Sequence, residues 1–184
     1  MQDITKMVGK EYYLPLLPRH GIYLTRAGHA DEERFARVFR GVWKRIPLRA
    51  RRTILRRWRT IRARHGRAAV MPQIQVLDRW ENWEDLSDDG TAFEPEPPAV
   101  YLGQCWVWGH SLYFHAKIVD ALPADHLGTL IAHELAHIVL PTIVNGYCDM
   151  SHLEVECCIH DLVMGWGFDQ DAFFAWMNSE VDRQ

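Results

Sequence analysis

One stretch of this 184-residue chain decides its fold: Leu130-Ile131-Ala132-His133-Glu134-Leu135-Ala136-His137-Ile138-Val139. If it is helical, His133 and His137 lie on one face, because side chains four residues apart stack along a helix. Both imidazoles can then reach one metal ion at about 2.0–2.1 Å. Glu134 follows the first histidine by one position and lies beside that metal, where it can take a proton from a bound water. The HExxH pattern is typical of zinc proteases, so the stretch predicts a metal site with a general base.

The residues around the motif predict that this helix is largely buried. Pro123-Ala124-Asp125 is typical of a helix start and Pro141 of a helix end. Most neighbouring positions are apolar: Leu127, Leu130, Ile131, Leu135, Ile138, Val139 and Leu140. Burying two imidazoles and a carboxylate without partners costs several kcal/mol. A bound metal would offset that cost; the alternative interpretation is a core helix whose histidines have other partners.

Length and composition predict one domain. The hydrophobic fraction is 48%, which is enough for a substantial core. We divide the chain into a basic helical N-terminal extension (residues 1–70) that packs on a core (residues 71–184). No run of 18 apolar residues is present, so no membrane association is expected. The N-terminal residues lack the apolar stretch of a secretory signal, and the expected location is the cytoplasm.

Charge is distributed unevenly along the chain. From Arg34 to Arg67 there are 14 of the 21 basic residues and no acidic one, while the rest carries 7 basic and 24 acidic residues. Two helices are expected here, with Pro47 between them. Their apolar stripes are Phe35, Val38, Phe39, Val42, Trp43 and Ile46, followed by Ile54, Leu55, Trp58 and Ile61. The charge suggests a nucleic-acid partner, with Arg51, Arg52, Arg56 and Arg57 as candidate contacts. Alternatively, these helices dock on an acidic body or present a solvated face.

The middle of the chain predicts strands. Residues 73–77 alternate polar and apolar side chains, and residues 101–108 and 112–119 flank a turn, which suggests a hairpin. Residues 81–98 are acidic and rich in turn formers, which indicates a surface loop. The predicted fold is therefore α+β. A small, twisted, mostly antiparallel sheet packs on the HExxH helix and on a second ligand helix, with two basic N-terminal helices.

A small sheet, an HELAH helix, a connector and a second helix together resemble the minimal zincin metallopeptidase core. The resemblance covers roughly residues 74–176 in layout, and only His133-Glu134-Leu135-Ala136-His137 is a specific match. It implies a zinc metalloendopeptidase that hydrolyses peptide bonds and whose strand before the active helix holds the substrate backbone. Among relatives, it is similar to the ImmA/IrrE-type regulators and to SprT-like proteases.

The third metal ligand separates the zincin branches. The metzincin pattern would need Gly and His at Leu140 and Ile143, so that branch is excluded. In the gluzincin-like branch a Glu on the next helix completes the site, and Glu154 is preferred. The small side chains of Cys157 and Cys158 follow it at i+3 and i+4, which would allow close helix packing.

Three other residues are alternatives for the third ligand. Glu156 shares a face with His152 and His160 that looks exposed to water. His152 as the ligand would make the site SprT-like, and Asp149 would make it aspzincin-like.

The resemblance also implies further roles. Three protein ligands leave one position for water, and zinc lowers the pKa of that water to about 7 while Glu134 acts as general base. Tyr147, with His160 and His152 as alternatives, is the candidate oxyanion stabiliser. Asp161 is a candidate to orient a ligand histidine.

Three functional interpretations follow. The first is a zinc-dependent peptidase acting on a protein or peptide substrate. The second is an SprT-like protease anchored to DNA by the basic helices between Arg34 and Arg67. The third is a zincin-fold interaction module without catalytic activity.

Overall fold

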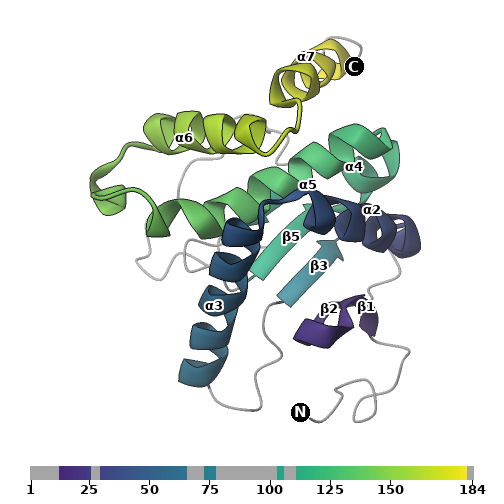
Figure 1. The fold of residues 1–184 in the computed structure, drawn as a ribbon. Coiled ribbons are helices and arrows are strands. Elements are labelled where there is room, and N and C mark those ends of the chain that lie inside the picture. Colours follow the sequence, from purple (N-terminus) through teal and green to yellow (C-terminus); the bar gives the residue numbers. More distant parts are fainter. Residues whose placement is uncertain (1–12, 26–29, 66–72, 78–102, 106–110, 182–184) are drawn as a thin grey trace, which may run out of the picture.

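The computed structural model describes residues 13–25, 30–65, 73–77, 103–105 and 111–181 (Figure 1). These residues form a mixed α+β fold with a sheet in the strand order β1-β2-β3-β5-β4. The strands are β1 (Tyr13–Leu17), β2 (Ile22–Thr25), β3 (Gln73–Leu77), β4 (Gly103–Cys105) and β5 (Ser111–His115). The α+β class is therefore confirmed.

The sheet is mixed rather than mostly antiparallel, which corrects the expectation. The outer pairs β1–β2 and β4–β5 are antiparallel, while β2–β3 and β3–β5 are parallel. Parallel neighbours need a crossover connection, usually helical. Helices α2 (Glu32–Arg45) and α3 (Leu48–His65) form that crossover between β2 and β3.

The N-terminal region adds a hairpin that the sequence interpretation missed. Strands β1 and β2 are joined by a 3-10 turn at Pro18–His20 and by Gly21, whose φ of 71° is in the left-handed region that glycine tolerates. Leu14 and Leu16 alternate into the core. Residues 13–25 thus belong to the same sheet as β3 and β5. This sheet contains strands from both sides of the expected boundary at residue 70.

Helices α2 and α3 pack through aromatic side chains. The Asp31 carboxylate caps α2 by accepting a hydrogen bond from the backbone N–H of Arg34 at 2.8 Å. Trp43 on α2 and Trp58 on α3 stack with ring centroids 6.4 Å apart. Pro47 lies between the two helices. Both helices therefore contribute to the core with their apolar faces.

Strand β5 is shorter than expected. It ends at His115, and the expected strand at residues 116–119 is instead the start of helix α4 (Ala116–Ala121). Ala116 and Val119 are buried three residues apart, while Lys117 and Asp120 are not, which is a helical period. The expected antiparallel pairing of β4 with β5 is confirmed.

Helix α5 (Ala124–Val139) carries the HExxH motif and is buried on nearly all sides. It packs against α2 and β4, and helix α6 (His152–Gly165) lies on its side away from β3 and β5 (Figure 1). Helix α7 (Gln170–Val181) also contacts α5. Within the described residues, no helix combines the length and apolarity needed to cross a bilayer.

Candidate metal centre

Helix α5 places the two histidines of the motif side by side. Their Nε2 atoms are 3.2 Å apart, and the rings meet edge to face with centroids 4.9 Å apart. His133 is 9% exposed and Glu134 only 4% exposed. The i,i+4 geometry expected from the sequence is therefore present, with the Glu134 carboxyl group buried beside it.

Glu156 on α6 completes a group of three side chains. Its Oε2 lies 3.3 Å from His133 Nε2, and its Oε1 lies 3.5 Å from His137 Nε2. In a tetrahedral site with bonds of 2.0–2.1 Å, any two ligand atoms are about 3.3 Å apart. The separations of 3.2, 3.3 and 3.5 Å match that spacing closely. His133, His137 and Glu156 can therefore hold one metal ion.

The preferred third ligand, Glu154, is not part of this group. The face of α6 that enters the core is Val155, Ile159 and Val163, spaced at i, i+4 and i+8. Glu156 follows Val155 and turns toward α5, whereas Glu154 lies on the opposite flank. This row of β-branched residues, not the pair Cys157 and Cys158, decides how α6 faces α5, which corrects the sequence interpretation.

Glu154 instead closes a capping box at the start of α6. Its carboxylate accepts hydrogen bonds from the backbone N–H of Ser151 at 2.8 Å and from the Ser151 hydroxyl at 2.7 Å. The Ser151 hydroxyl oxygen in turn accepts from the backbone N–H of Glu154 at 3.3 Å. The backbone hydrogen bond and the hydroxyl lower the pKa of Glu154. The Glu154 carboxylate therefore caps the start of α6 and does not join the group on α5.

The remaining candidates lie around this centre rather than in it. His152 is 89% exposed, and its Nδ1 is 3.9 Å from Glu156 Oε1, so it borders the group without joining it. Asp149 is exposed, and Tyr147 packs partly buried against the core in the connector. Asp161 is 89% exposed and pairs with His160 at 3.7 Å, so it does not orient a ligand histidine.

Gln170 makes the contact that was expected of Asp161. It is 1% exposed, and its Nε2 lies 2.8 Å from His133 Nδ1, the ring nitrogen that faces away from Glu156. Its Oε1 is buried and makes no hydrogen bond to a described residue. Gln170 begins α7, and its neighbours Asp169 and Asp171 are exposed. Nothing in the polar run Asp-Gln-Asp distinguishes the inward residue, so the sequence offered no signal for it.

Burial and neighbouring charges shift the pKa values of the two histidines in opposite directions. Burial disfavours the charged form of His133, but the hydrogen bond to Glu156 and the charges of Glu134 and Glu156 outweigh it, and its pKa is raised. Burial and the neighbouring His133 lower the pKa of His137 to about 4. Burial opposes ionisation of Glu156, yet His133 and the other histidines lower its pKa. The centre therefore stabilises a carboxylate at Glu156 and a neutral, metal-binding form of His137.

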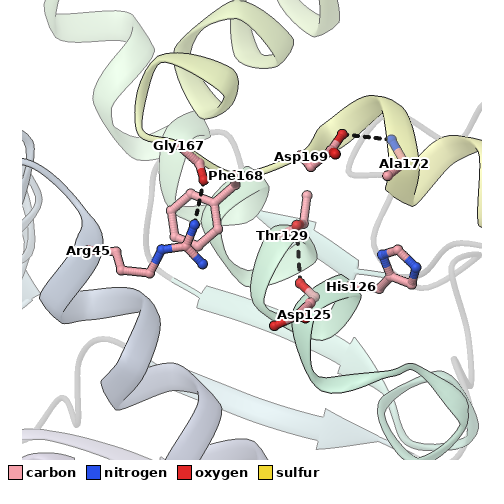
Figure 2. Close-up of a pocket in the computed structure, with 8 residues that line it drawn as sticks. All are labelled: Arg45, Asp125, His126, Thr129, Gly167, Phe168, Asp169 and Ala172. Atoms are coloured by element: carbon pink, nitrogen blue, oxygen red, sulfur yellow. Dashed lines mark hydrogen bonds between the residues drawn. The ribbon is translucent and has the colours of Figure 1, made fainter.

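A cavity of about 410 Å³ lies at the opposite end of α5 (Figure 2). Two of its charged side chains, Arg45 and Asp169, interact with neighbouring residues. Arg45 lies over the Phe168 ring at 4.1 Å and donates to the carbonyl of Gly167, and the Asp169 carboxylate accepts from the backbone N–H of Ala172 at 2.9 Å. The cavity thus adjoins the loop that positions Gln170 and contains none of the three candidate ligands.

The candidate nucleic-acid contacts separate into two pairs on α3. Arg52 and Arg56 are exposed, whereas Arg51 and Arg57 are half-buried.

Comparison of the chain with protein-family models, with curated proteins and with solved structures found no match. The geometry of the centre itself is therefore the basis on which function is inferred.

Proposed function

We propose that the protein is a zinc-dependent peptidase. The observation that carries the proposal is the His133, His137 and Glu156 group at tetrahedral ligand spacing, with the buried Glu134 next to it in sequence. Two imidazoles and one carboxylate are a ligand set found in catalytic zinc sites, where a fourth position is left for water or substrate. This favours a catalytic over a purely structural metal.

Within this proposal, the chain's own residues divide the chemistry. A zinc ion at this site would supply a Lewis acid and a bound water with a pKa near about 7. Glu134 follows His133 on the ligand helix, where it would act as general base toward a water held at the site and would return the proton to the leaving amine. Tyr147, in the connector between α5 and α6, remains the candidate for oxyanion stabilisation.

Gln170 positions His133 in this proposal. A histidine that binds metal through Nε2 carries its proton on Nδ1 and needs an acceptor there. A half-turn of the Gln170 amide brings its buried Oε1, which has no hydrogen-bond partner among the described residues, to Nδ1 in place of Nε2. An amide suits both states of the centre: its N–H₂ donates when His133 carries its proton on Nε2, and its oxygen accepts when Nε2 is free for metal.

A peptide substrate is supported by the edge of the sheet beside α5. Among the described strands, β4 ends the strand order on that side, and it packs against α5. An extended peptide that adds to such an edge offers its backbone in register along the helix that carries the catalytic residues. The zincin resemblance named the strand before the active helix, which is β5, as the substrate strand. Because β5 is paired with both β3 and β4, the proposal assigns this role to β4 instead.

The exchange Glu134→Gln tests the proposal. It keeps the size of the side chain but removes the base, so zinc content measured by mass spectrometry should stay at the wild-type value. Hydrolysis of a library of fluorescence-quenched random peptides should fall about 10²- to 10⁴-fold. Wild-type protein that binds zinc but cleaves none of the peptides would favour the interaction module. Cleavage that is unchanged in the variant would overturn the role of Glu134.

A further inference from the structure

The arginines of α2 and α3 are used in different ways. On α2, Arg34 donates to the carbonyls of Val119 and Leu122, and Arg40 donates to the carbonyl of Pro15 at 2.9 Å. Arg45, at the end of α2, donates to Gly167 and stacks on Phe168. These guanidinium groups connect α2 to the rest of the fold through hydrogen bonds to backbone carbonyls. They are therefore engaged within the protein.

Among the side chains of α3 that the structure describes (residues 48–60), four exposed arginines have no hydrogen bond or ion pair with another described residue. They are Arg49, Arg52, Arg56 and Arg59. At about 100° per residue they fall within an arc of about 80°, and they span about 15 Å along the axis. The four therefore form one line of positive charge, called here the arginine stripe.

The opposite side of α3 is fixed in the core. Ala50, Ile54 and Trp58 are buried there, and Arg51 and Arg57 flank them half-buried. Leu48, 53% exposed, is the one exposed apolar side chain beside the stripe among the described residues, whereas a membrane-surface helix requires a broad apolar face. The stripe therefore offers a partner mainly positive charge and the N–H donors of its guanidinium groups.

A nucleic-acid backbone fits the stripe in charge and in spacing. Successive arginines are three, four and three residues apart, a rise of about 4.5–6 Å each. This is of the same order as the roughly 3.4 Å of helix axis between neighbouring phosphates of one DNA strand. The guanidinium fork binds phosphate oxygens in a bidentate manner. No carboxylate interrupts the helix, because residues 34–67 contain no acidic residue.

We propose that the arginine stripe of α3 binds the phosphate backbone of nucleic acid without reading its sequence. The set differs from the one expected from the charge run alone, since Arg49 and Arg59 replace the half-buried Arg51 and Arg57. The inference does not depend on the metal centre: loss of zinc through Glu156→Ala leaves the stripe intact, so the two proposals fail separately.

The test is binding of the full chain to a short fluorescein-labelled DNA duplex, followed by anisotropy across a series of salt concentrations. Four phosphate contacts predict a slope of log K against log salt of about −3.6 for a duplex, or about −2.8 for a single strand. The double variant Arg52→Gln, Arg56→Gln removes two contacts and should lower the steepness of the duplex slope by about 2.

The double variant Arg37→Gln, Lys44→Gln is the matched control. It removes the same charge from exposed positions on α2 and should leave the slope unchanged. Equal weakening by both double variants would mean that net charge alone attracts DNA and would overturn the proposal. Equally tight, stripe-dependent binding to poly-glutamate or to phosphatidylserine vesicles would also overturn it, in favour of an acidic protein or a membrane surface.

Discussion

The two glutamates of α6's first turns have different roles although they are two residues apart. Glu154 bends back to the helix start and satisfies the N–H and hydroxyl of Ser151. Glu156 reaches across to α5 and lies 3.3 Å from His133 and 3.5 Å from His137. One glutamate accepts a hydrogen bond from the backbone of its own helix, and the other contacts two histidines of a neighbouring helix. The side of the helix, not the residue type, decides which.

The largest expected effect separates these two residues by metal binding. Glu156→Ala removes a ligand atom and should reduce zinc affinity by far more than the roughly 10- to 100-fold that an outer partner contributes. Glu154→Ala removes only a cap and should leave zinc affinity unchanged. Competition with a chromophoric chelator measures both. Loss of zinc in the Glu154 variant with retention in the Glu156 variant would reverse the comparison.

A smaller effect is expected at Gln170, which contacts the ligand His133 rather than the metal. Gln170→Leu removes the acceptor for Nδ1–H and should weaken zinc binding about 10- to 100-fold. Gln170→Glu restores an acceptor and should bind zinc within a few-fold of wild type. Thermal unfolding of the zinc-free variants is the control, because a purely structural role would lower stability without rescue by Glu. Equal zinc affinity in the Leu and Glu variants would exclude a positioning role.

The smallest effect concerns the stability of the cap. Ser151→Ala should lower the free energy of unfolding by about 1 kcal/mol, the usual contribution of an N-cap hydroxyl. The measurement is urea unfolding of the zinc-free protein, with Ser179→Ala as control, because Ser179 lies exposed in the last turns of α7, far from an N-cap. A loss of unfolding free energy of the same size in the control would mean that the effect of Ser151→Ala does not come from the N-cap hydrogen bond.

The pH dependence of the cap follows from the lowered pKa of Glu154. The carboxylate stabilises the fold in full above its unfolded value of 4.5, and this contribution is lost as the pH falls through the lower folded value. Glu154→Gln keeps a hydrogen-bonding group but does not titrate. The difference in unfolding free energy between wild type and this variant should therefore shrink on acidification below about pH 4. A difference that is constant with pH would contradict the capping role.

Much of the fold was predictable because its signals are local. The periodic apolar residues of α2 and α3 and the alternation at Ile74 and Val76 each follow from near neighbours in sequence. The β1–β2 hairpin and the parallel order were missed, since pairing depends on residues far apart in the chain. The end of β5 was misplaced because a short, mostly apolar segment such as residues 112–119 fits both a strand and a helix.

The amino-acid sequence alone was enough to predict three residues of the candidate centre. His133, Glu134 and His137 are related by the helix period alone, so their geometry needs no other part of the chain. Only the tertiary structure decided the rest: Glu156 as the third candidate ligand, Gln170 as the partner of His133, and Arg49, Arg52, Arg56 and Arg59 as the exposed stripe. Each depends on how one helix is rotated against another, and that rotation is set by the packing of apolar rows such as Val155, Ile159 and Val163.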